Sequence, residues 1–143
     1  MRILIDADAC PVVNEAIKIA NENKTECILF CDTAHQMERV GAKTITVSKG
    51  ADSVDFALAN YIQKGDIVIT QDYGLAAMSL SRGARVLHQD GLEYTNDNIE
   101  ALLLSRYTAQ KIRRAGGRLH GGKKRSASQN EAFCKALLNL LLA

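Results

Sequence analysis

Short apolar runs alternate with amphipathic segments along the first ninety residues of the chain. The apolar runs are typical of buried strands, which we predict at residues 2–5, 26–30, 44–47, 66–70 and 84–87. Apolar positions at helical spacing predict helices at residues 12–21, 51–63, 73–80, about 96–113 and about 130–142. A short helical turn is expected at residues 36–40.

The order of these elements favours an α/β fold. Strands that are apolar throughout and alternate with helices form parallel sheets with helices on both faces. We therefore expect a three-layer α/β/α architecture around a central, mainly parallel, five-stranded sheet. A single domain is expected over residues 1–143, with the sheet core at 1–95 and C-terminal helices with a basic, glycine-rich arm at 96–143.

The composition is that of one globular domain. The chain has 143 residues, of which 47% are hydrophobic and 24% charged. Its longest apolar run, residues 136–143, is far shorter than the roughly 20 residues of a membrane span. The start MRILIDADA is unlike a secretory signal, so we expect a cytoplasmic protein without a membrane partner. The last helix could form a homodimer contact, although packing on its own sheet is favoured.

Charge is divided unevenly along the chain. Residues 1–100 carry nine Lys and Arg against fifteen Asp and Glu, whereas residues 101–143 carry nine Lys and Arg against Glu131 alone. A solvated basic surface is the simplest explanation, but arginine also binds phosphate oxygens in pairs, which favours a nucleic-acid partner. Aromatic residues make up only 5% of the chain, so stacking on unpaired bases has little support in the sequence.

Five aspartates follow the carboxyl ends of three predicted strands. Asp6 and Asp8 follow the first strand, Asp52 and Asp55 open the helix after the third, and Asp72 follows the fourth. Ligand sites of open α/β sheets lie at this edge, so we expect the five acids to converge there. Gathered carboxylates repel one another, and a divalent cation removes that conflict. Hard oxygen ligands favour one or two Mg²⁺ or Mn²⁺ ions.

Several of these acids also have a simpler structural explanation. Asp52 could be a favourable charge at a helix N-terminus, and Asp6 and Asp72 could cap helices. Two other acids are set aside, because Asp66 opens the fourth strand at the opposite edge and Asp32 follows the second strand without a clear companion. The histidines are expected to be exposed or hydrogen-bonded side chains.

Four segments carry a resemblance to a known family. They are DADACPV at residues 6–12, SKGADSVDFALANYI at 48–62, DIVITQDYGLAAMSL at 66–80 and RRAGGRLHGGKKR at 113–125. In this order, and spread over nearly the whole chain, they resemble the bacterial YaiI/YqxD family. That family in turn resembles the PIN-like (PIN/NYN) nucleases, which implies a PIN-like fold.

The resemblance to PIN-like nucleases also implies site residues. Their pattern has an Asp that ends the first strand, an acid in the helix before the fourth strand, and a Thr-x-Asp that ends the fourth. Asp6 matches the first position, Asp52 or Asp55 the second, and Thr70 with Asp72 the third. With the convergence of the five acids at one edge, the predicted catalytic residues are Asp6, Asp55 and Asp72, and the predicted metal ligands are these three with Asp8 and Asp52.

Together these patterns favour a metal-dependent phosphodiesterase that acts on nucleic acid, with RNA favoured over DNA. Its predicted substrate-binding residues lie after two strands and in the basic C-terminal segment; they are Ser48, Lys49, Thr70, Arg106, Arg113, Arg114, Arg118, Lys123, Lys124 and Arg125. Two other functions stay open. The chain could bind nucleic acid without catalysis, or resemble the haloacid dehalogenase type of phosphohydrolase, in which an aspartate attacks phosphorus.

Overall fold

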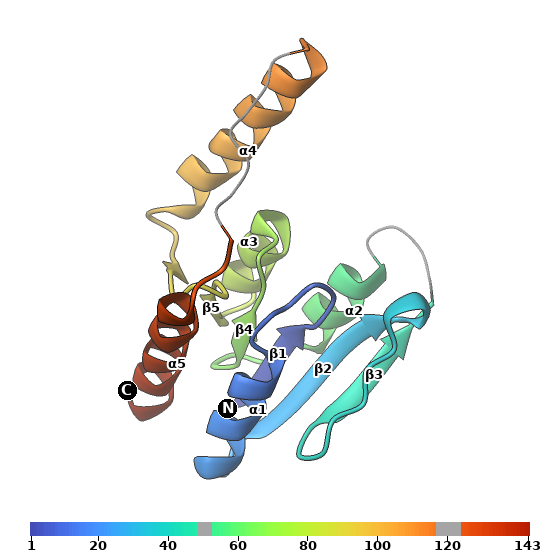
Figure 1. Cartoon of the computed structure of the whole chain (residues 1–143), viewed down its shortest axis with the longest axis vertical. Helices are drawn as coiled ribbons and strands as arrows, with labels where there is room; N and C mark the ends of the chain where they lie inside the picture. Colours follow the sequence, from blue (N-terminus) through green and yellow to red (C-terminus); the bar gives the residue numbers. More distant parts are fainter. Residues whose placement is uncertain (49–52, 117–123) are drawn as a thin grey trace.

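The computed structural model describes residues 1–48, 53–116 and 124–143. These residues contain a six-stranded sheet in the order β3-β2-β1-β4-β5-β6 (Figure 1). The strands are β1 (Arg2–Asp6), β2 (Glu26–Asp32), β3 (Lys43–Val47), β4 (Ile67–Ile69), β5 (Arg85–Leu87) and β6 (Glu93–Tyr94). The first five run parallel to their neighbours and β6 runs antiparallel to β5, which confirms the mainly parallel sheet.

The sheet has one strand more than the five that we predicted. β6 has two residues, in which Glu93 pairs with Leu87 and Tyr94 with Val86. A strand this short offers no alternation over the window in which strands are recognised, so the sequence does not reveal it. Tyr94 is nevertheless completely buried, so β6 closes the edge of the core.

Helices cover both faces of the sheet. They are α1 (Val13–Glu22), α2 (Ser53–Tyr61), α3 (Tyr73–Ser81), α4 (Ile99–Arg114) and α5 (Ala127–Leu142). None of these helices has the length and hydropathy that a membrane crossing requires. Because alternate side chains of a strand point to opposite faces, Ile3 and Ile5 pack with α1 and α5, whereas Leu4 packs with α2 and α3. The predicted three-layer α/β/α arrangement is therefore present (Figure 1).

The C-terminal helix α5 packs on the chain's own core, as the sequence favoured. Phe133 and Leu137 are completely buried, in the same cluster as side chains of β1 and α1. The helix starts at Ala127, before the predicted residue 130, because Ser126 and Gln129 form a capping box there.

The turn between β5 and β6 lies directly against α5. Gly91 in this turn has a φ of +95°, and a Cβ at this position would lie 2.8 Å from the carbonyl oxygen of Ala132. Glycine avoids both the strained conformation and the clash, so the turn and the helix can approach closely.

Helix α4 extends away from the sheet (Figure 1). Its first residue, Ile99, is buried, and Leu102 and Leu103 pack at the edge of the core. Side chains further along are mostly exposed, including Leu104 and Tyr107. Only the first turns of α4 therefore belong to the packed body of the protein.

The predicted helical turn at residues 36–40 is wrong. A 3₁₀ helix, η1 (Thr33–His35), directly follows β2, and residues 36–40 form no helix. Asp32 starts η1, because its Oδ1 accepts hydrogen bonds from the backbone nitrogens of Ala34 and His35, each at 2.9 Å. Aspartate favours such turns over a longer helix for this reason.

Candidate active site

The strand order reverses at β1, which lies between β2 and β4. At such a switch point the loops after two neighbouring strands separate, and α/β proteins bind ligands in the resulting crevice. Asp6 ends β1, and Thr70 and Asp72 follow β4 at this position. A cavity of about 310 Å³ opens here, lined by Asp6, Asp8, Gln71, Asp72, Tyr73 and Arg106.

Thr70 joins the two strand ends. Its hydroxyl donates to Asp6 Oδ2 at 2.9 Å and accepts from the backbone nitrogen of Asp72 at 3.0 Å. Only 2% of Thr70 is exposed. These hydrogen bonds position the two acids relative to each other, while the predicted substrate contact of Thr70 stays a prediction.

Asp6 has a strongly raised pKa. Its pKa is raised from 3.8 to about 7, first by burial and then by the nearby carboxylates of Asp55, Asp8 and Asp72, while the hydrogen bond from Thr70 opposes the rise. Asp6 is therefore partly protonated at neutral pH. A cation placed against it would favour the charged form.

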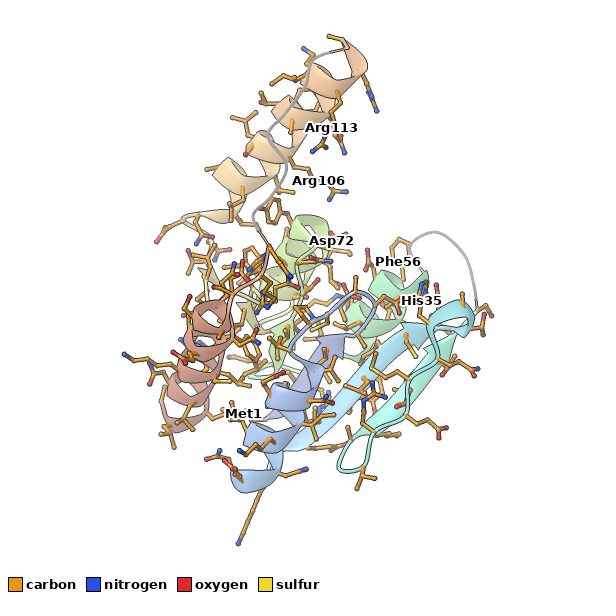
Figure 2. The ribbon with its side chains drawn as sticks, in the orientation of Figure 1. Met1, His35, Phe56, Asp72, Arg106 and Arg113 are labelled. Carbon is orange, nitrogen blue, oxygen red and sulfur yellow. The ribbon has the colours of Figure 1, made fainter. Side chains whose placement is uncertain are left out.

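Asp72 has both a structural role and a place at the site. Its Oδ1 accepts a hydrogen bond from the backbone nitrogen of Leu75 at 3.0 Å, which confirms that it caps α3. The same oxygen lies 3.7 Å from Nη1 of Arg106, which α4 holds above the acids (Figure 2). Arg106 is half-exposed, so its guanidinium can reach a ligand in the cavity.

Asp55 is the member of the Asp52 and Asp55 pair that the described residues place at the site. It lies in the first turn of α2, and its charge acts on Asp6. It also shares a second cavity, of about 350 Å³, with Asp72 and Arg106. Asp52 lies outside the described residues, so its role as a metal ligand stays a prediction.

Further ligand atoms lie at the ends of β1 and β2. Asp8, Asp32 and His35 each place one ligand atom within 4.8 Å of the others. Nδ1 of His35 is 2.8 Å from Oδ1 of Asp32 and 3.9 Å from Oδ1 of Asp8. Burial raises the pKa of Asp8, whereas the hydrogen bond with His35 lowers the pKa of Asp32. Among the described residues, the buried Oδ1 of Asp8 has no hydrogen-bond partner.

The expectation that Asp32 lacks a companion is therefore wrong, because Asp8 and His35 lie beside it. The parallel pairing of β1 with β2 matches Asp6 with Phe30, which brings the end of β2 beside Asp8. The sequence alone does not state which strands are neighbours, so this contact was hidden. His35 is exposed and hydrogen-bonded, as expected of the histidines.

The basic residues predicted to bind substrate are distributed over several places. Arg106 lies at the acids, while Arg113 is exposed in the last turn of α4 (Figure 2). Arg114 is exposed in the same turn. Ser48 is exposed directly after β3, and Lys124 is exposed before α5. The remaining positions lie outside the described residues; they are Lys49, Arg118 and Lys123.

Arg125 is used within the protein. It forms an ion pair with Asp90 and donates hydrogen bonds to the carbonyl oxygen of Gln89 and to Oδ1 of Asn130, both at 2.7 Å. These contacts hold the start of α5 against the turn after β5. Arg125 therefore has a structural role, and its predicted substrate contact stays a prediction.

Fold and site together define an α/β protein with a mostly parallel six-stranded sheet and a group of carboxylates at the switch point of that sheet. The chain belongs to the YaiI/YqxD family, because the family model described as "Uncharacterized BCR, YaiI/YqxD family" matches residues 4–143. This match confirms the family resemblance that the four sequence segments carry.

Relatives cover nearly the whole chain. A UPF0178 protein from Exiguobacterium sibiricum is 50% identical over 141 residues, which are 99% of this chain and 96% of that protein. A UPF0178 protein from Ruminiclostridium cellulolyticum is 52% identical over 138 residues, which are 96% and 90% of the two chains. One from Clostridium acetobutylicum is 44% identical over 144 residues, covering 99% and 97%. No solved structure matches the chain.

Proposed function

We propose that the protein is a metal-dependent phosphodiesterase that cleaves nucleic acid, with RNA favoured over DNA. The observation that carries this proposal is the environment of Asp6. This carboxyl group is half-buried beside three further acids, where its pKa is about 7. Such perturbed carboxyl groups gather at functional sites, where a ligand compensates the unfavourable charge.

One or two Mg²⁺ or Mn²⁺ ions fit the donor set. The acids offer the hard carboxylate oxygens that these ions prefer. Asp6, Asp55 and Asp72 would hold one ion at the switch point. The unpartnered buried oxygen of Asp8, which lies with Asp32 and His35, would be satisfied by a second ion beside it. When bound, such ions lower the pKa of a water molecule and stabilise charge that develops on phosphate.

Arg106 is the chain's own candidate for holding the phosphate. The 3.7 Å between its Nη1 and Asp72 is too long for a hydrogen bond, so this contact does not fix the guanidinium in place. Its planar fork can bind two phosphate oxygens together. Arg113 and Arg114 are exposed further along the same helix, where they could bind the next phosphates of the nucleic-acid strand.

The arrangement of the acids also supports the proposed likeness to PIN-like nucleases. The implied pattern requires acids from the first strand, from the helix before the fourth strand and from the end of the fourth strand. Asp6, Asp55 and Asp72 come from these three elements, and the charges of Asp55 and Asp72 both act on Asp6. The topology thus supports the nuclease proposal over an arrangement of unrelated caps.

Hydrolysis of a labelled single-stranded RNA and of a matched hairpin tests the proposed function. We expect cleavage by the wild-type protein with Mn²⁺ or Mg²⁺ and none with EDTA. The double variant Asp6→Asn, Asp72→Asn should lose cleavage and stay folded, because asparagine caps helices about as well as aspartate. Asp97→Asn, which changes an exposed acid outside the cavity, is the matched control and should cleave like wild type.

The outcomes separate the remaining functions. Binding of both RNAs without cleavage at any metal concentration would contradict the phosphodiesterase and leave a binding module. A stable beryllofluoride adduct on an aspartate would instead indicate the covalent mechanism of the haloacid dehalogenase type.

A further inference from the structure

We propose that the cavity between α2 and α3 is a subsite for an unpaired nucleobase, so that the substrate is single-stranded. This inference rests on the proposed nucleic-acid substrate. The cavity has a volume of about 350 Å³, within the range of small-molecule sites. Phe56, Leu75 and Met78 form its apolar part, and Asp55, Asp72 and Arg106 line its polar side.

Phe56 is the aromatic residue that lines this cavity and can stack against a ligand. It lies on α2 directly after Asp55, and 58% of it is exposed, whereas Leu58 and Ala59 on the same helix are buried in the core. Figure 2 shows Phe56 and Asp72 at neighbouring helix ends. A single exposed apolar residue is ordinary on a protein surface, but this ring borders a cavity that also contains catalytic candidates.

The two cavities are joined through shared residues. Asp72 and Arg106 line both the apolar cavity and the acidic cavity that contains Asp6. If Arg106 binds a phosphate of the nucleic acid at the acids, the base attached on one side of that phosphate can therefore reach Phe56. Gly74 also lines this cavity, and a Cβ there would lie 3.2 Å from Oδ1 of Asp72 and crowd that carboxylate.

A planar base suits this cavity better than an aliphatic group. Bases stack on aromatic rings without sequence preference, and cationic arginine adds to such stacking. In a duplex both faces of each base are covered by neighbours, so only an unpaired or unstacked base can enter. The cavity thus supplies the stacking partner that the low aromatic content did not suggest.

The test uses a single-stranded RNA that carries one 2-aminopurine, whose fluorescence falls when the base stacks. Binding is measured in EDTA, so the strand stays intact. We expect the wild-type protein to quench the probe, Phe56→Ala to abolish the quenching and weaken binding about tenfold, and Phe56→Tyr to restore both. Leu104→Ala, which removes a similarly exposed apolar side chain from α4, is the matched control and should behave like wild type.

Two results would overturn the inference. One is quenching and affinity in Phe56→Ala equal to those of wild type; the other is an equal loss of affinity for a fully paired duplex, which would point to a general surface effect. Because neither readout needs cleavage, the two proposals can fail separately. Quenching that depends on Phe56 without any hydrolysis would retain the base subsite and contradict the phosphodiesterase.

Discussion

Asp6→Asn is expected to stabilise the metal-free protein at pH 8 and at the same time to abolish its cleavage of RNA. The folded protein raises the pKa of Asp6 from 3.8 to about 7, so at pH 8 folding must bury a charged carboxylate that the unfolded chain exposes to water. One pKa unit corresponds to about 1.4 kcal/mol, so the free energy of unfolding should rise by up to about 4 kcal/mol. Asparagine keeps an oxygen that can accept the hydrogen bond from Thr70.

The raised pKa of Asp6 also predicts how the stability difference between wild type and Asp6→Asn changes with pH. Between about pH 4 and pH 7 the folded protein binds the Asp6 proton that the unfolded chain has released, so the contribution of Asp6 to wild-type stability falls as the pH rises through this range and is lost above pH 7. The variant lacks this contribution. Urea unfolding in EDTA at pH 5 and pH 8 measures both slopes, with Asp97→Asn as the control.

Asp6→Asn should lower the rate of RNA cleavage, although it raises the stability of the metal-free protein. Removing even the partner of a metal ligand typically costs about 10-fold to 100-fold, so loss of Asp6 itself should reduce the cleavage rate more than about 100-fold. A gain in stability with a loss of activity is typical of a functional site, whereas replacing a purely structural acid would lower stability. A variant less stable than wild type at pH 8 would contradict this view of Asp6.

Phe133→Ala should be the most destabilising of the substitutions considered. Phe133 is completely buried between α5 and the sheet, in one cluster with Ile3 and Ile5. Loss of a buried phenylalanine side chain and the cavity it leaves cost about 3–5 kcal/mol in comparable cores. Urea unfolding at pH 5, where Asp6 is protonated and its charge does not contribute, measures the loss.

Leu138→Ala is the matched control for this second prediction. Leu138 is on the same helix but 39% exposed, so its truncation should cost about 1 kcal/mol or less. Equal losses for the two variants would mean that α5 does not pack through its Phe133 face. A loss below about 1 kcal/mol for Phe133→Ala would contradict the packing of α5 on the sheet.

The sequence predicted the main elements because their patterns are long enough to read. The five apolar strands and the five helices occur within a few residues of their expected positions. β6 and η1 were missed, since a two-residue strand and a single 3₁₀ turn depend on contacts that a periodic pattern does not contain. The start of α5 shifted because a capping box at Ser126, and not the apolar pattern, determines it.

The sequence could predict only that acids which follow parallel strands lie at the same edge of the sheet. Asp6 and Asp72 were expected at one edge because both follow strands, and β1 and β4 do lie side by side. The neighbourhood of Asp8 and Asp32 depends on strand order, and the burial of Thr70 depends on packing. The internal role of Arg125 could not be predicted, because charge alone does not reveal a partner such as Asp90.

Binding of Mn²⁺ at pH 8, followed by the electron paramagnetic resonance signal of the free ion, tests most directly whether these acids form a metal site. We expect wild type and Asp97→Asn to remove one or two equivalents of free Mn²⁺, and Asp6→Asn to bind at least about tenfold more weakly. Wild-type affinity should fall at pH 5, because Asp6 is then protonated. An unchanged free-ion signal with wild type at pH 8, or equal affinity in Asp6→Asn, would contradict a metal site at the switch point.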